Sequence, residues 1–295
     1  MRTRHLSLPP KGGSYKRNLV ASAFRRKDRL KWFALTAAGL LLGSAAVPRA
    51  QSPAGPADRP AARLDQNSVT AHAQLLDKAK HGGIDVYFVG DSIARRWGAL
   101  DYPDFLANWK QNFFGWNAAD FGWGADRVEN ILWRLENGEL DGVNPKVIVI
   151  LAGTNNVGNR PGGDSKIADI TRGLAGVIHT CRRKAPAATI VVTAIFPRND
   201  NMAVVPEINR INANLATLAD GKVVRFVNVN DKLADKDGRL VGGMMNADKL
   251  HPALPGYQVW ADALKPIFTE LLGPPASTDH APPPTGDPSK RAGRP

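Results

Sequence analysis

The sequence predicts an α/β fold in which a parallel sheet of about five strands is covered by helices on both faces. Three observations lead to this prediction. Short apolar runs alternate along the chain with segments of helical periodicity, which is the rhythm of strand–helix–strand units. The run 147–151 is apolar at every position, as expected of a parallel strand buried on both faces. Polar residues that could carry chemistry follow several of these runs, at the edge where sites form in such sheets.

Five strands and five helices are expected. The strands cover residues 84–89, 117–121, 146–152, 189–196 and 223–229. The helices cover residues 68–80, 127–137, 166–184, 206–218 and 256–272. In the second helix Val128, Ile131, Leu132 and Leu135 share one face, and Gly138 provides a stop. Segments 101–114 and 231–245 are expected to be loops that set the depth of a substrate pocket.

Composition favours a domain with its own hydrophobic core and without a cofactor. Hydrophobic residues make up 43% of the 295 residues, which is enough for a core without a disulfide framework. Cys181 is the only cysteine, which excludes an intrachain disulfide and a thiolate metal cluster, and we expect it in the core. The sequence contains neither H-E-x-x-H nor a glycine-rich nucleotide-binding pattern after a strand, so no metal or nucleotide cofactor is expected.

The positive charge is concentrated near the N-terminus. Residues 1–31 hold ten basic residues and one acid, whereas residues 66–273 contribute only +1 to the net charge of +12. The folded part is therefore nearly neutral, and no nucleic-acid partner is expected. The uncharged stretch 32–47 follows the basic segment, which is typical of a signal peptide, or of an anchor if it is not cleaved. We expect export to the periplasm or the extracellular space, with membrane anchoring in the uncleaved case.

Four regions follow from these patterns. Residues 1–50 are expected to be the signal peptide or N-terminal anchor, and residues 51–63, rich in Pro and Ala, a linker. Residues 64–273 have the length of one domain and contain no internal repeat. Residues 274–295 contain seven prolines and no apolar periodicity, so a disordered tail is expected.

Ser92 is the candidate nucleophile. It belongs to Gly90-Asp91-Ser92, which directly follows the apolar run 84–89 and precedes a helix-like segment. At such a position the backbone N–H of a serine can stabilise developing negative charge, although serine also caps helices often. A second copy of the tripeptide, Gly163-Asp164-Ser165, follows a polar loop instead of a strand, so we interpret Asp164 and Ser165 as capping residues.

His251 is the candidate base and Asp248 its partner. A serine hydroxyl needs an imidazole to accept its proton and a carboxylate to orient that imidazole. In Asp248-Lys249-Leu250-His251-Pro252 the spacing of three lets the carboxylate reach the ring. The histidines at positions 5, 72, 81, 179 and 280 are expected to lack such a neighbour.

Donors for an oxyanion can be named as well. Asn155, in Gly153-Thr154-Asn155-Asn156 after the buried strand 146–152, offers a side-chain amide, although Asn and Gly are also common in turns. The backbone N–H groups of Ser92 and of the Gly124–Ala125 turn are further donors.

These blocks, in this order, resemble the SGNH (GDSL-type) hydrolases. The segment 132–140, Leu-Trp-Arg-Leu-Glu-Asn-Gly-Glu-Leu, is most similar to esterases of the type of the platelet-activating-factor acetylhydrolase catalytic subunits. The resemblance extends over residues 84–272. It implies a three-layer flavodoxin-like fold, a metal-free serine esterase mechanism with Ser92, Asp248 and His251, and a homodimer.

The resemblance also implies an oxyanion hole from Ser92, Asn155 and a glycine, and here the sequence departs from the family. The family's glycine falls on Ala125, with Gly124 just before it. Alanine can donate its backbone N–H equally well, but a positive φ at this position would cost strain.

The expected function is hydrolysis of a short acyl ester, acetyl above all, carried by a small molecule, a glycan or a lipid. The alternative is a non-catalytic glycan- or lipid-binding module on the same fold, if Ala125 disables the oxyanion hole. The natural substrate is not encoded in any motif of the sequence.

Overall fold

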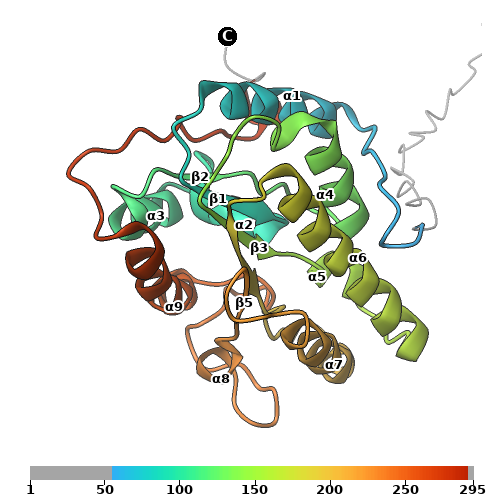
Figure 1. Cartoon of the computed structure of the whole chain (residues 1–295). Coiled ribbons are helices and arrows are strands. Elements are labelled where there is room, and N and C mark those ends of the chain that lie inside the picture. Colours follow the sequence, from blue (N-terminus) through green and yellow to red (C-terminus); the bar gives the residue numbers. More distant parts are fainter. Residues whose placement is uncertain (1–54, 292–295) are drawn as a thin grey trace, which may run out of the picture. The chain divides into compact units, whose positions relative to one another are not determined.

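The computed structural model describes residues 55–291, and a five-stranded parallel sheet lies at their centre (Figure 1). The strands are β1 (Val86–Gly90), β2 (Ala118–Asp120), β3 (Val147–Leu151), β4 (Thr189–Thr193) and β5 (Val224–Val227). Their order in the sheet is β2-β1-β3-β4-β5, and every pair is parallel. This order is flavodoxin-like, with the switch point between β1 and β3, and it confirms the predicted fold class.

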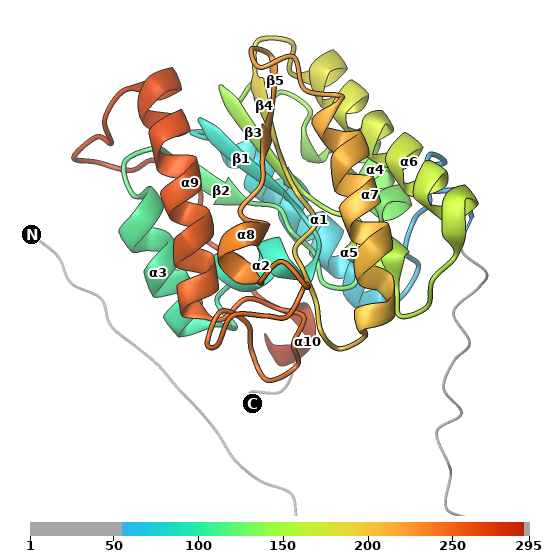
Figure 2. The ribbon, with the colours of Figure 1, turned by 90° about the horizontal axis from the view of Figure 1, so that it is seen from below.

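Helices cover both faces of the sheet (Figure 2). One face packs against α1 (Gln66–His81), α4 (Val128–Arg134), α6 (Gly163–Lys184) and α7 (Val205–Ala216). The other packs against α2 (Ser92–Gly98), α3 (Pro103–Phe113), α8 (Asn230–Leu233) and α9 (Leu254–Leu272). The short helices α5 (Thr154–Val157) and α10 (Pro288–Arg291), a π-helical turn at Leu135–Glu139 and a 3-10 turn at Met202–Val204 complete the described elements.

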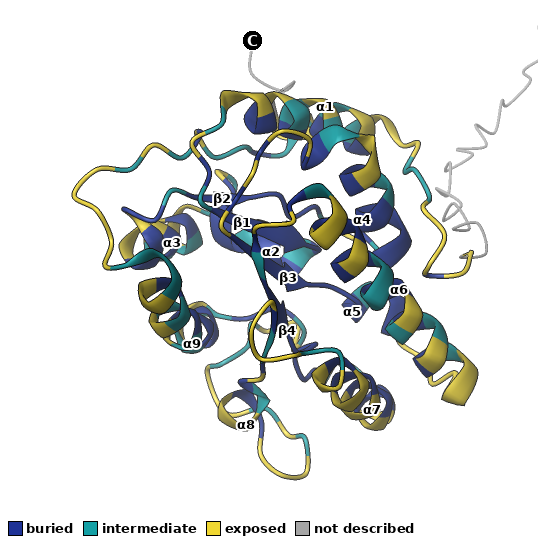
Figure 3. Cartoon of the chain, viewed as in Figure 1, coloured by how far each residue is buried: buried dark blue, intermediate teal, exposed yellow. Residues whose placement is uncertain are grey.

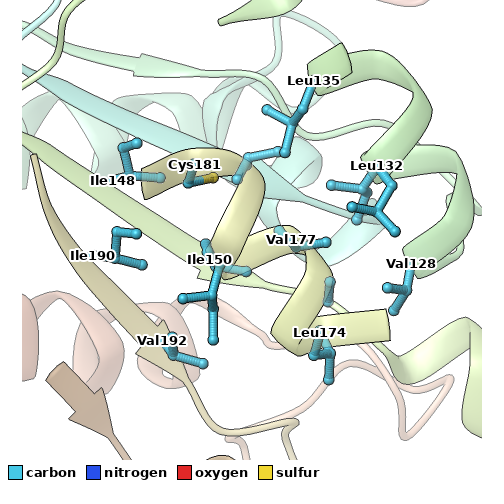
Figure 4. Close-up of a cluster of buried hydrophobic side chains, with 14 of the residues drawn as sticks. Val128, Leu132, Leu135, Ile148, Ile150, Leu174, Val177, Cys181, Ile190 and Val192 are labelled. Atoms are coloured by element: carbon cyan, nitrogen blue, oxygen red, sulfur yellow. The ribbon is translucent and has the colours of Figure 1, made fainter. Parts of the chain in front are cut away.

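The central strands β1 and β3 are buried on both faces, as their apolar sequences require (Figure 3). Successive side chains of a strand point to opposite faces, so Tyr87 and Ile148 belong to the layer of α4 and α6, whereas Phe88 and Val149 belong to that of α3 and α9. Figure 4 shows the first layer, where Cys181 of α6 lies among aliphatic side chains. Its burial raises the pKa of the thiol to about 12, so Cys181 is a core residue, as expected.

The second layer is rich in aromatic side chains, and these pack α2 against α9. Trp97 of α2 is fully buried and lies with its ring 4.9 Å from Tyr257 and 5.0 Å from Trp260 of α9, between ring centroids. The Tyr257 hydroxyl donates to the carbonyl oxygen of Ile93 over 2.8 Å. Because Ser92 is the first residue of α2, this packing also fixes the position of Ser92.

Helix α3 replaces part of the loop expected at 101–114. Its signals are present in the sequence: Pro103 occupies the first helical turn, and Leu106, Trp109 and Phe113 recur at helical spacing on the buried side. The prediction of a loop was wrong because the polar residues between these positions hid the helical spacing of the apolar ones.

The expected linker and disordered tail are partly wrong. Ala57 is fully buried, and its N–H donates to Asp169. Segment 274–291 is held by scattered polar contacts, among them His280 N–H to Asn117 and Asp287 N–H to Asp101. Single backbone hydrogen bonds leave no periodic signal in a sequence, so composition alone suggested disorder. The expected signal peptide or anchor and residues 51–54 and 292–295 lie outside the described residues. Within residues 55–291 no helix is long and apolar enough to cross a bilayer.

Candidate active site

Ser92 begins α2 immediately after β1, at the carboxyl edge of the sheet. Strand β1 ends in Gly90, where a Cβ would lie 2.3 Å from the Leu151 carbonyl oxygen, so only glycine fits between these strands. The carboxylate of Asp91 then caps the helix by accepting from the N–H of Ile93 at 2.9 Å. As the first helical residue, Ser92 has a backbone N–H without an acceptor inside its helix.

His251 lies in a tightly hydrogen-bonded loop before α9. The Asp248 carboxylate accepts from the N–H groups of Leu250 and His251 at 3.1 and 3.0 Å. The His251 carbonyl accepts from the N–H of Asn246 at 2.8 Å. Gly256 in α9 allows the loop to approach, because a Cβ there would lie 2.2 Å from the Met244 carbonyl oxygen. The short Asp–x–x–His spacing is thus folded into a turn that holds both side chains.

The structure brings Ser92, His251 and Asp248 into one chain of hydrogen bonds. The Ser92 Oγ lies 2.8 Å from Nε2 of His251, and Nδ1 of His251 lies 2.8 Å from Oδ2 of Asp248. A carboxylate only accepts hydrogen bonds, so Nδ1 carries the ring proton and Nε2 is free to accept the proton of the serine hydroxyl. This is the geometry of an activated serine nucleophile.

The electrostatics of the pair favour the protonation states that this geometry needs. Burial works to raise the pKa of the Asp248 carboxyl, but hydrogen bonds from the backbone of His251 and Leu250 and from the His251 ring outweigh it and bring the pKa to about 2. Burial lowers the pKa of His251, and the nearby Arg96 guanidinium lowers it further against the opposing effect of Asp248. At neutral pH Asp248 is therefore ionised and His251 neutral.

Besides Ser92, the predicted oxyanion donors lie in the loop that follows β2 and in α5, which follows β3. One N–H of the Asn155 amide donates to the carbonyl oxygen of Asp126 at 2.8 Å, which fixes the amide and leaves its second N–H free. Ala125 is exposed and has a φ of 62°, in the left-handed region. The neighbouring Gly124 is half-buried, and its carbonyl oxygen accepts from Arg63.

Asn156, next to Asn155 in α5, connects this helix to α4 by hydrogen bonds. Its side-chain oxygen accepts from the N–H of Val128 at 2.9 Å, and its amide donates to Glu129 at 2.8 Å. Asn156 was part of the predicted block, but only its neighbour Asn155 was singled out. The signal available in the sequence is the pair of adjacent asparagines. In the structure Asn155 is half-buried and Asn156 is buried.

A buried polar cluster behind the Ala125 loop was missed. Arg134 donates through Nε to Asp126 at 2.7 Å and through Nη1 to Glu139, which is fully buried. Nδ1 of His72 lies 2.7 Å from the other oxygen of Glu139. The expectation that His72 has no carboxylate neighbour is therefore wrong: the partner comes from a distant segment of the chain, which sequence spacing does not reveal. We refer to His72, Asp126, Arg134 and Glu139 as the buried cluster.

Two further sequence candidates have structural roles. Asp164 and Ser165 lie in the first turn of α6, but neither side chain caps the helix, and Asp164 pairs with Arg210 at 2.7 Å instead. Trp97, next to Arg96 in α2, is a core residue. Arg96 lies at the site, with Nη1 3.4 Å from Oδ2 of Asp248. Among residues 55–291 no three His, Cys, Asp or Glu side chains converge as metal ligands would.

Comparison with known proteins agrees with this arrangement. Residues 88–259 match the model of the GDSL-like lipase/acylhydrolase family. Platelet-activating factor acetylhydrolase IB subunit alpha1 from Bos taurus is 29% identical over 210 residues, covering 70% of this chain and 85% of the relative. The sheet and helices resemble a putative acylhydrolase from Bacteroides fragilis (TM-score 0.57, 20% identity, covering 70% of this chain and 99% of that one).

A second solved structure is similar in fold, a GDSL-like lipase from Bacteroides thetaiotaomicron (TM-score 0.54, 19% identity, covering 69% of this chain and 96% of that one). The family match spans more than half of the chain, from β1 into α9, and so includes the segments of Ser92, Asn155 and His251. The chain therefore belongs to the GDSL-like lipase/acylhydrolase family and is a serine ester hydrolase.

Proposed function

We propose that the enzyme removes a short acyl group, acetyl above all, from a glycan or lipid ester, with Ser92 as the nucleophile. The observation that carries the mechanism is the hydrogen-bonded chain from Ser92 Oγ through His251 to Asp248, with both links at 2.8 Å. The preference for acetyl is supported by the likeness to the Bos taurus acetylhydrolase subunit.

The proposed reaction has two steps. Ser92 Oγ attacks the ester carbonyl while His251 Nε2 takes the hydroxyl proton, and His251 then returns this proton to the departing alkoxide, which leaves an acyl group on Ser92. Water, deprotonated by His251, then attacks the carbonyl of the acyl-enzyme. The bond to Ser92 Oγ breaks, His251 returns the proton to this oxygen, and the carboxylic acid is released. Asp248 keeps the ring oriented and stabilises the imidazolium that forms in each step.

The oxyanion is held in this proposal by the N–H groups of Ser92 and Ala125 and by the free N–H of Asn155. Each donor of this kind contributes about 3 kcal/mol to transition-state stabilisation. Support comes from the anchoring of the Asn155 amide on Asp126, because a donor that is already fixed needs no reorganisation during the reaction. The positive φ of Ala125 costs about 1 kcal/mol relative to glycine and does not remove its N–H.

Hydrolysis of p-nitrophenyl esters from acetate to long-chain acids tests the proposal on the full chain. We expect activity that falls with chain length and is lost in Ser92→Ala, while Ser165→Ala, at the second Gly-Asp-Ser tripeptide, keeps wild-type rates. Undiminished turnover by folded Ser92→Ala would contradict the assignment of the nucleophile. A rate that rises with chain length would contradict the short-acyl preference alone.

The strained Ala125 is the one observation that favours the alternative of a non-catalytic glycan- or lipid-binding module. That alternative predicts saturable binding of an acetylated glycan or lipid without release of acetate, equally in wild type and Ser92→Ala. Acetate release by the wild type would exclude it.

Export is proposed from the sequence alone. The basic segment 1–31 and the uncharged stretch 32–47 support it, and both precede the described residues. Fractionation of cells that produce the full chain, with N-terminal sequencing of the exported form, would show whether the segment is removed.

A further inference from the structure

A cavity of about 290 Å³ lies at the β2 edge of the sheet and is lined by neither Ser92 nor His251. One wall is β2 with the buried face of α3, and segment 281–284 of the C-terminal region closes another. The walls are largely apolar and include Leu106, Trp109, Phe113, Ala118, Pro282 and Pro284. Since one water needs about 10–15 Å³ of this kind of volume, the cavity is large enough for a ligand of ten or more non-hydrogen atoms.

A buried lysine is one of the residues that line this apolar space. Lys78, from α1, lines the cavity and is only 4% exposed. Its Nζ donates to the carbonyl oxygen of Asp120 at 2.8 Å, and no carboxylate of residues 55–291 lies within 4.0 Å of it. An ammonium has three N–H donors, so two remain beside the bond to Asp120, and the centroid of the Phe121 ring lies 5.5 Å from Nζ. Burial lowers the pKa of Lys78 to about 8 against the opposing charges of Asp120 and Glu139, which leaves it mostly protonated at neutral pH.

The other charged groups of the cavity are either occupied or at the rim. The Asp279 carboxylate accepts from the N–H groups of Gly115 and Ala281 at 2.7 and 2.8 Å. Asp120 accepts from the N–H of Gly122, and burial raises the pKa of its carboxyl to about 6. Lys110 is exposed. Lys78 is therefore the buried charged group of the cavity that still has N–H donors for a ligand.

We propose that this cavity is a second binding site, for a small carboxylate with an aromatic body, and that Lys78 donates to the carboxylate. The ammonium gains charge-assisted hydrogen bonds that the backbone carbonyl alone does not supply. Trp109 and Phe113 offer ring edges and faces to an aromatic group. The site is independent of the proposed hydrolysis, because none of its residues belongs to the Ser92 site.

Ligand-detected NMR titration with phenylacetate tests the site on the full chain carrying Ser92→Ala, with phenylacetamide as the uncharged ligand of the same shape. We expect saturable binding of phenylacetate and binding of phenylacetamide that is weaker by about tenfold or more, because only the anion gains charge-assisted bonds from Lys78. Adding Lys78→Met should weaken phenylacetate binding to the same degree, whereas the matched rim variant Lys110→Gln should change it by less than about twofold.

The pH dependence gives a second readout. The ionised Asp120 repels a bound carboxylate, so affinity should rise as pH falls from 7.5 to 5.5, through the Asp120 pKa of about 6. If Lys78→Met does not fold, Ala281→Phe takes its place, because a phenyl group at this half-buried position fills the cavity and should abolish binding. Absence of saturable binding, equal binding of the amide, or unchanged binding in these variants would each overturn the proposal.

Discussion

The described chain contains two histidine–carboxylate pairs, His251–Asp248 and His72–Glu139, and their hydrogen bonds are nearly the same length. His251 Nδ1 is 2.8 Å from Asp248, and His72 Nδ1 is 2.7 Å from Glu139. Their surroundings differ. Asp248 is exposed and His251 reaches Ser92 through its second nitrogen, whereas Glu139 is fully buried, held by Arg134, and the His72 ring lies 4.8 Å from that of Trp133. A histidine–carboxylate pair is therefore no evidence of catalysis until the second ring nitrogen has a nucleophile.

The two pairs are also connected. The Asp126 carboxylate belongs to the buried cluster through Arg134, while its backbone carbonyl accepts from the Asn155 amide of the active site. The Asp126 carboxylate, next to Ala125, is thus held by an ion pair with Arg134. Its backbone carbonyl oxygen is held by a hydrogen bond from the Asn155 amide. We therefore expect the buried cluster to fix the positions of the Ala125 N–H and the Asn155 amide, the proposed oxyanion donors.

Replacing each histidine by asparagine separates the roles most sharply. His251→Asn should reduce kcat by about 10³–10⁴-fold, because the serine loses its base. His72→Asn should leave kcat within about threefold, because its ring touches no reacting group. Steady-state hydrolysis of p-nitrophenyl acetate by both variants checks this, and comparable losses in both would mean that the two pairs are not distinct in function.

Removing the cation of the buried cluster should destabilise the fold. Arg134→Met leaves Asp126 and Glu139 buried without their partner, which costs about 3–5 kcal/mol of the free energy of unfolding. The matched surface variant Arg183→Met, whose guanidinium is exposed and 4.0 Å from Glu136, should cost less than about 0.5 kcal/mol. Urea unfolding of both variants measures the difference, and equal stabilities would show that the cluster does not hold the loop.

The sequence predicted what is encoded locally. Strand runs such as 147–151 are apolar throughout because both faces are buried, and the carboxylate partner of His251 lies only three residues from it. The His72–Glu139 pair spans 67 positions with no shared motif, so only the fold brings it together. The positive φ of Ala125 could likewise not be predicted from the local sequence, because it depends on how Arg134 holds the neighbouring Asp126 and not on the residue type.

The role of Arg96 extends the comparison to pH, because its guanidinium lies near the His251–Asp248 pair, with Nη1 3.4 Å from Oδ2 of Asp248. It lowers the pKa of His251 in addition to burial, so Arg96→Gln should raise that pKa. The acidic limb of kcat/KM, where His251 becomes protonated, should then move to higher pH. A pH–rate profile measures this, with the exposed Arg172→Gln on α6 as the control that leaves the limb in place. A shift to lower pH would contradict the assigned electrostatics.

Ala125→Gly should have the smallest effect. Glycine adopts a φ of 62° without strain, so the free energy of unfolding should increase by about 0.5–1 kcal/mol, while the backbone N–H stays in place and kcat changes by less than about twofold. Thermal unfolding and ester hydrolysis of the variant check both values. A large gain in kcat would show that alanine impairs the oxyanion hole, and a loss of stability would show that the left-handed conformation is not strained.

Covalent labelling tests most directly the claim that only the His251–Asp248 pair activates a nucleophile. A fluorophosphonate should react with wild type and with His72→Asn at Ser92, as found by peptide mass spectrometry, and its rate of reaction should fall at least about a hundredfold in His251→Asn, because general-base catalysis is lost. Labelling of Ser165 or another residue, or labelling of Ser92 at the same rate without His251, would contradict the assignment.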